Sequence, residues 1–119
     1  ILEQDKTKND LLETKLEIEK SCLQLFMQKA VAKDYQTLSG MIDSAPSRTE
    51  FFKEMVTTLD NSLMLRIWTL VNSYARIIVK DNMIESGVYE DLLEAMRENQ
   101  AQQAIKLYEK HFAEFVDGK

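Results

Sequence analysis

The chain has 119 residues, of which 45% are hydrophobic and 29% charged, with 3 glycines and 1 proline. This composition is typical of one packed, mainly helical domain and argues against an intrinsically disordered chain. The formal net charge of -5 and the lack of a Lys/Arg cluster are unlike the basic face of a free-standing nucleic-acid-binding domain.

The compartment is indicated by cysteine usage and by the most apolar stretch. The single cysteine, Cys22, cannot form an internal disulfide, which favours a reducing cytoplasm. The stretch 63–79 is interrupted by Arg66, Asn72 and Arg76, so it is too polar and too short to span a membrane. No signal peptide is visible. The chain begins with Ile-Leu-Glu-Gln instead of Met, and we expect a fragment or a chain lacking its first residues.

Apolar periodicity predicts about six helices and no strands. After a frayed polar stretch to about residue 8, the first helix runs from about residue 9 to 32. Its apolar stripe contains Leu12, Leu16, Leu23, Phe26 and Ala30. Lys15 and Glu19 lie one turn apart on this stripe. They form either a surface ion pair or a site at which the Lys15 cation meets a ligand anion.

The clearest helix-boundary signal of the chain lies between residues 44 and 50. A second, short helix over 34–43 is stopped by Pro46, and Ser47 with Glu50 predicts a capping box for the third helix, which runs to about residue 59. Asp60-Asn61-Ser62 then offers a helix end and a new N-cap, so we expect a tight corner before the fourth helix.

The fourth helix, over about 63–80, is apolar on more than one side, which predicts packing on two sides. One stripe contains Leu63, Ile67, Val71, Tyr74 and Ile78, and Met64, Trp68 and Ala75 widen it. Trp68 is the best candidate for a subunit interface, with burial in the monomer as the alternative. Arg76 lies off the main stripe and is either solvated or faces a cavity across from Lys15.

A loop over 80–87 precedes the last two helices, predicted over about 88–98 and 101–116. The inner stripe of the last helix is predicted to contain Ala104, Tyr108, His111 and Phe115. His111 on this stripe is either a buried neutral histidine with one hydrogen bond or a ligand contact.

Catalytic signatures are missing from the sequence. Three glycines cannot supply a phosphate-binding loop, and one histidine with one cysteine cannot form a usual zinc site. Nothing local brings Cys22 to His111 as a nucleophile pair. No nucleophile, base and orienting group can be assembled, so we expect no enzymatic activity.

Three stretches resemble the C-terminal effector-binding (FCD) domain of GntR-family transcription regulators of the FadR subfamily. The stretch LLETKLEIEKSCLQL at 11–25 resembles the opening motif L-L-E-x-R-x-x-x-E. The stretch FFKEMVTTLDNSLMLRIW at 51–68 resembles F-H-x-x-L-x-x-x-x-G-N-P-x-L-x-x-L. The stretch LLEAMRENQAQQAIKLYEKHF at 92–112 resembles I-x-x-A-I-x-x-G-D-x-x-x-A-x-x-x-M-x-x-H-L without a gap. Each motif alone is weak, but the three occur in the right order and spacing.

The resemblance implies an all-α, antiparallel bundle of about six helices that encloses a ligand cavity. It also implies a homodimer whose DNA contacts are made by an N-terminal winged helix-turn-helix outside this chain. The acidic charge is consistent with this division. A small-molecule effector would then modulate DNA binding. The alternative is a protein-interaction scaffold, because the hairpin over 88–116 resembles a tetratricopeptide unit, although no second copy recurs about 34 residues away.

Many members of this family bind a metal through an Asp and three His. Here the corresponding positions are Arg48, Phe52, Tyr89 and His111, and one imidazole beside a cation does not hold a divalent ion. We therefore expect no metal and no other cofactor, and an anionic effector held by protein cations. The predicted effector-binding residues are Lys15, Glu19, Phe52, Asn72, Arg76, Tyr89 and His111. The aromatic residues Phe52 and Tyr89 are either core or ligand-contacting.

Overall fold

Six helices make up the regular structure of the described part of the chain. The computed structural model describes the backbone of residues 2–116 and the side chains of residues 5–116. The helices are α1 Leu2–Lys29, α2 Ala32–Ile42, α3 Arg48–Thr58, α4 Ser62–Ile78, α5 Ser86–Arg97 and α6 Ala101–His111, and no strand occurs among the described residues. The all-helical class predicted from periodicity is confirmed. No described helix is both long and apolar enough to cross a membrane.

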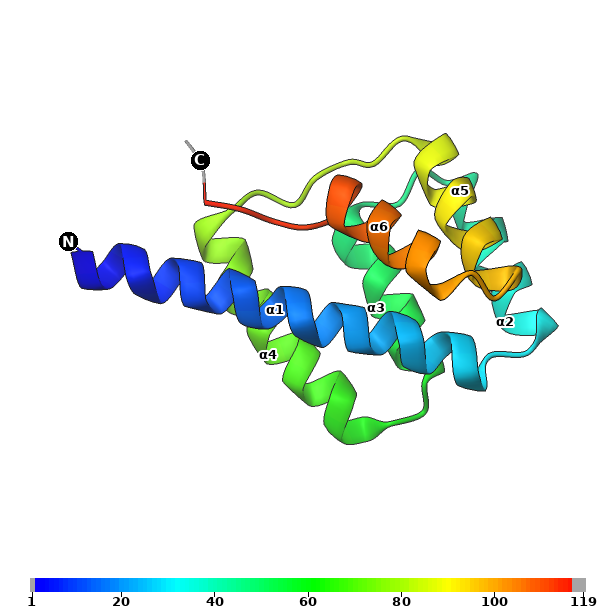
Figure 1. Cartoon of the computed structure of the whole chain (residues 1–119), viewed down its shortest axis with the longest axis horizontal. Helices are drawn as coiled ribbons and strands as arrows, with labels where there is room; N and C mark the ends of the chain where they lie inside the picture. The colour runs from blue at the N-terminus through cyan, green and yellow to red at the C-terminus, as the bar shows by residue number, and fades with distance from the viewer. Residues whose placement is uncertain (1, 117–119) are drawn as a thin grey trace.

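The long helix α1 is the axis of the bundle (Figure 1). It packs against α3, α4 and α6, while α5 packs against α6 and α2. Figure 1 shows α6 beside the C-terminal half of α1, α2 and α5 toward the same end of the molecule, and α4 crossing α1 near its middle. After α6 the chain leaves the bundle end and runs back along α1, because residues 114–116 lie beside Asn9, Leu12 and Leu16. We call residues 113–116 the tail.

Local sequence determines where the middle helices begin and end. The Ser47 hydroxyl accepts from the Glu50 amide, and the Glu50 carboxylate accepts from the Ser47 amide, so the predicted capping box is confirmed. Asp60 adopts a left-handed conformation (φ 53°), which turns the chain between the end of α3 and the start of α4. The Asn61 side chain then accepts from the Met64 amide and caps α4. The same left-handed turn recurs at Asn99, between α5 and α6.

The first and last helices differ from their predicted bounds. The predicted frayed stretch to residue 8 is wrong, since α1 already begins at Leu2. The predicted end of the last helix at residue 116 is also wrong, since α6 ends at His111. Near this end, the carbonyl of Phe112 accepts a hydrogen bond from Arg48 Nε instead of from an amide in a following helical turn.

An aromatic cluster forms the core between α3, α5 and α6. Its members are Phe51, Phe52, Tyr89, Tyr108 and Phe112, all nearly inaccessible to solvent and linked by ring contacts with centroids 4.4–6.2 Å apart. Phe26, Tyr35 and Leu38 extend the core toward α1 and α2. Fully burying such side chains contributes about 1.5–3 kcal/mol each, so this cluster holds the three helices that surround the charged groups described next.

Only one of the two apolar sides predicted for α4 is buried in the monomer. Trp68, Asn72 and Ala75 form its inner face and are buried. Trp68 is therefore buried within the monomer, so of the two predicted alternatives the burial is confirmed and the subunit interface is wrong. The predicted stripe is mainly exposed, because Leu63, Ile67 and Tyr74 lie on the opposite side of the helix. Periodicity located the two apolar sides but could not say which one meets α1.

A buried charged cluster as the candidate functional site

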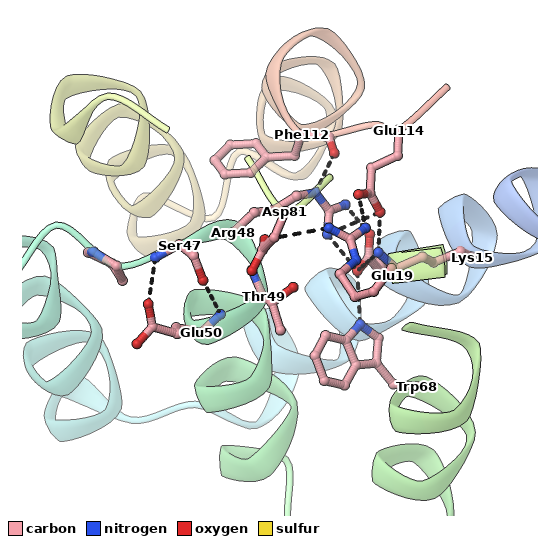
Figure 2. A network of polar contacts seen from close by, with 12 residues as sticks. Lys15, Glu19, Ser47, Arg48, Thr49, Glu50, Trp68, Asp81, Phe112 and Glu114 are labelled. Carbon is pink, nitrogen blue, oxygen red and sulfur yellow. Dashed lines mark hydrogen bonds and ion pairs between the residues drawn. The ribbon is translucent and has the colours of Figure 1, made fainter. Parts of the chain in front are cut away.

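Five ionisable side chains meet between α1, α3, α4 and the tail. They are Lys15, Glu19, Arg48, Arg76 and Glu114, and we call them the charged cluster. Figure 2 labels four of them: Lys15, Glu19, Arg48 and Glu114. All except Arg76 have side chains that are at most 4% exposed, and Arg76 is 21% exposed. Charged side chains are almost never buried without partners, so this group of ions is the most unusual polar feature among the described residues.

Glu19 lies at the centre of the charged cluster. Both carboxylate oxygens accept from the Arg48 guanidinium, with Nη1 at 3.1 Å from Oε2 and Nη2 in contact with Oε1. Trp68 Nε1 donates to Oε2 at 2.8 Å, and the Tyr108 hydroxyl donates to Oε1 at 2.6 Å. Burial by itself raises the pKa of Glu19, but the charge and hydrogen bonds of Arg48, with Lys15 and Tyr108, lower it below its ordinary value. Glu19 is therefore ionised at neutral pH.

All three nitrogens of the Arg48 guanidinium donate hydrogen bonds. Besides Glu19, its Nε donates to the carbonyl of Phe112 at 2.6 Å, and its guanidinium carbon lies 4.8 Å from the centre of the Phe52 ring. Burial lowers the pKa of Arg48, but Glu19 and Glu114 together raise it above its ordinary value. The planar guanidinium suits this bidentate pairing in a way that lysine could not. Arg48 thus links α1, α3 and the end of α6.

Glu114 enters the charged cluster from the tail. Figure 2 shows its carboxylate pointing back toward Lys15. One oxygen contacts Lys15 Nζ, the other contacts Arg76 Nη2, and Arg48 Nη1 lies 3.6 Å away. Burial lowers the pKa of Lys15, and the Arg48 charge adds to this, while Glu19 and Glu114 oppose it. Each of the three cations therefore depends on a carboxylate that is remote from it in sequence.

The positive and negative charges inside the cluster nearly cancel. Lys15, Arg48 and Arg76 contribute three positive charges, and Glu19 and Glu114 contribute two negative ones. The exposed Asp81 supplies a further carboxylate, 3.5 Å from Arg76 Nη1. Three cations that converge on a desolvated carboxylate form the kind of site that binds an anion, because charge-assisted hydrogen bonds are strong where water is excluded.

The cluster does not offer an obvious nucleophile. Burial raises the pKa of the Cys22 thiol to about 12, and the Glu19 charge adds to this, so the thiol stays protonated at neutral pH. Burial also raises the pKa of Tyr108, whose hydroxyl is a hydrogen-bond donor to Glu19. No group of three His, Cys, Asp or Glu side chains suited to a metal occurs in the described part of the chain. Arg48 and Phe52, at two of the positions where the resemblance placed metal ligands, are both buried in the core.

Three of the seven predicted site residues are brought together in the cluster: Lys15, Glu19 and Arg76. The interpretation of Lys15 and Glu19 as a surface pair is wrong, since both are buried. Asn72 is buried on the same face of α4 as Trp68, and its Oδ1 has no hydrogen-bond partner among the described residues.

The other three predicted site residues are not members of the charged cluster, although the Phe52 ring lies against the Arg48 guanidinium. Phe52 and Tyr89 belong to the aromatic cluster, and the Tyr89 hydroxyl donates to the carbonyl of Pro46. The prediction of an inward His111 is wrong, because that side chain is exposed. Tyr108 and Phe112, one turn apart, take the inner positions at the end of α6.

Sequence reasoning missed Arg48, Glu114, Trp68 and Tyr108 as members of this network. Arg48 was interpreted only as a cation that disfavours a metal, because the capping box around it accounts for a polar residue at that position. Glu114 was hidden by an apparent continuation of the last helix. Only contacts between residues remote in sequence reveal the tail as part of the site: those of Glu114 with Lys15, 99 residues away, and with Arg76, 38 residues away.

A small apolar groove adjoins the cluster. It lies between α1 and the tail, has a volume of about 250 Å³, and is lined by Asn9, Leu12, Glu13, Leu16 and residues 114–116. Glu114 thus has the cations on one side and the groove on the other.

The fold and the site together define an all-helical bundle with a buried ionic network between α1, α3, α4 and the tail. Comparison with protein families, with curated proteins and with solved structures found no match.

Proposed function

We propose that this chain is the effector-binding and dimerisation domain of a bacterial transcription regulator that resembles the FadR subfamily of the GntR family. In this proposal it acts in the cytoplasm, and DNA is contacted by a winged helix-turn-helix outside this chain. The order and spacing of the three motifs motivate the proposal, and the six-helix architecture is consistent with it.

The observation that carries the ligand-binding part is the convergence of Lys15, Arg48 and Arg76. They come from α1, α3 and α4, yet all three cations contact or closely approach the carboxylate of Glu114. Arg48 occupies the first of the positions that the resemblance assigns to metal ligands. A fixed guanidinium there supplies positive charge in place of a metal ion. The effector class that fits is a small organic acid.

A thermal-shift screen of metabolite carboxylates tests this part. A ligand at 100 times its Kd stabilises the folded state by about 2.7 kcal/mol. We expect at least one organic acid to raise the Tm of the wild type, and the rise to be lost in Arg76→Met. Arg97→Met is the matched control, since Arg97 is also an ion-paired arginine in the last turn of its helix but lies on the surface of α5. A screen without a hit, or equal shifts in both variants, contradicts the proposal.

The observation that carries the dimerisation part is the exposed face of α4. Leu63, Ile67, Leu70, Tyr74 and Ile77 are between 40% and 81% exposed. Their spacing of 4, 3, 4 and 3 residues is the a/d spacing of a helix that pairs with another helix. The stripe is about 21 Å long at a rise of 1.5 Å per residue. We call it the α4 seam, and a second copy of this chain is the partner that a two-fold symmetric pairing of this seam requires.

Sedimentation velocity at micromolar concentration tests the seam. We expect the wild type to be a dimer and Leu70→Glu to be a monomer, because the new charge is buried without a partner in the paired state. Gln103→Glu on the exposed surface of α6 introduces the same charge away from the seam and should leave the dimer intact. A monomeric wild type contradicts the dimerisation part but leaves the ligand-binding part standing.

A further inference from the structure

The tail is held in place mainly by one carboxylate. Among described residues, the only backbone hydrogen bond of the tail runs from the Ala113 amide to the carbonyl of Tyr108, at 3.1 Å. Phe115 is 65% exposed, and Val116 packs beside Leu12. Glu114, by contrast, is 4% exposed and ion-paired with Lys15 and Arg76. The backbone conformation of the tail therefore depends on a side chain more than on regular structure.

The charges also indicate that another anion could take the place of the Glu114 carboxylate. If its carboxylate left the cluster, Lys15 and Arg48 would retain Glu19 as their only buried carboxylate, and Arg76 would retain only the exposed Asp81. Buried cations without counter-charge are costly, so this state needs another anion or water in the vacated position. A free carboxylate of similar size offers the same acceptor oxygens to the same donors.

We propose that Glu114 is a tethered carboxylate that occupies the anion site, and that a carboxylate ligand binds by displacing the tail. This inference rests on the proposed ligand-binding function and adds its mode of regulation. The tail and the ligand compete for Lys15, Arg48 and Arg76, so the tail sets the apparent affinity. Because the apparent Kd equals the intrinsic Kd divided by the fraction of molecules with an open site, a tail bound for 90% of the time weakens binding about tenfold.

Displacement of the tail also changes the surface of the protein outside the site. Release of Glu114 removes the main anchor of residues 113–116 and uncovers the side of α1 that carries Leu12. Arg48 connects this event to the end of α6, because its Nε holds the carbonyl of Phe112. Ligand binding thus changes the C-terminal surface of the bundle without rearrangement of the aromatic cluster.

Sodium propionate is the probe, because it reproduces the terminal three carbons of the glutamate side chain. The fluorescence of Trp68, the only tryptophan, reports binding, since its indole donates to Glu19 within the cluster. Sodium chloride at the same concentration corrects for ionic strength. We expect Glu114→Ala to bind propionate at least about tenfold more tightly than the wild type. Glu109→Ala is the matched control, because it removes an exposed α6 carboxylate that pairs with Lys20, and it should titrate like the wild type.

The outcomes separate the two proposals. Equal propionate affinity of Glu114→Ala and the wild type overturns competition by the tail but leaves an anion site. Absence of propionate binding in every variant overturns both the tail inference and the anionic effector. If Glu114→Ala lacks the helical circular dichroism of the wild type, Glu114→Gln carries the test, since it keeps the shape and removes the charge. As a second readout, propionate should accelerate hydrogen exchange of residues 113–116 in the wild type, and unchanged exchange at saturation overturns displacement.

Discussion

The substitution Glu19→Gln tests whether the charged cluster is one interdependent unit. It keeps the size of the side chain, removes the central negative charge and leaves Arg48 and Lys15 buried with Glu114 alone. Glutamine also cannot accept from Arg48, Trp68 and Tyr108 with the strength of a carboxylate. Breaking a buried ion pair by removing one partner costs about 3–5 kcal/mol, because the remaining charge is uncompensated.

This loss is large relative to the whole fold. At about 0.05–0.15 kcal/mol per residue, a domain of this length has a stability of about 6–18 kcal/mol. We therefore expect the urea midpoint of Glu19→Gln to fall by about a sixth or more, and its Tm to fall by about 10–20 °C. Far-UV circular dichroism should monitor unfolding, since Trp68 fluorescence is perturbed directly by the substitution.

A double-mutant cycle identifies the cause of the loss. Arg48→Met alone leaves Glu19 with one cation fewer, whereas Glu19→Gln with Arg48→Met removes both charges of the bidentate pair. We expect the double variant to be about 2 kcal/mol more stable than the sum of the single losses predicts. Additive losses, or a Glu19→Gln variant within about 1 kcal/mol of the wild type, would refute the argument that these charges depend on one another.

Four further predictions follow from single contacts. The pKa of Glu19 is lower in the folded state than in the unfolded state, where it is near 4.5. Its contribution to stability is therefore complete above the unfolded pKa and is lost as the pH falls through the folded pKa. The urea midpoint should drop between pH 6 and pH 3, and it should drop less in Glu19→Gln. Ser47→Ala removes the α3 cap and should cost about 1 kcal/mol in urea unfolding, and a cost below about 0.3 kcal/mol would contradict the cap. Cys22 should react with a thiol reagent only at the rate of unfolding, so rapid modification of the native chain would contradict its burial. His111→Ala should leave both Tm and propionate affinity unchanged within about 0.5 kcal/mol, because the side chain is exposed.

Much of the local structure followed from sequence alone. The helical class came from apolar spacing, and the start of α3 came from Ser47 and Glu50, whose side chains and amides satisfy one another within a single turn. The start of α4 at Asn61 is equally local. These features could be predicted because donor and acceptor are at most three residues apart, so no tertiary contact is needed to form them.

The site depended on contacts that no local pattern contains. Lys15 and Glu19 carry the same spacing whether they lie on a surface or in a core. The difference is made by Arg48, 29 residues from Glu19, and by Glu114, 99 residues from Lys15. Likewise, both sides of α4 are apolar. The side that is buried is the one whose Trp68 indole donates a hydrogen bond to Glu19 on α1. Sequence thus determined which residues can form helices. Tertiary structure decided which charges are buried, because burying a charge is favourable only where its partners from remote segments are already in place.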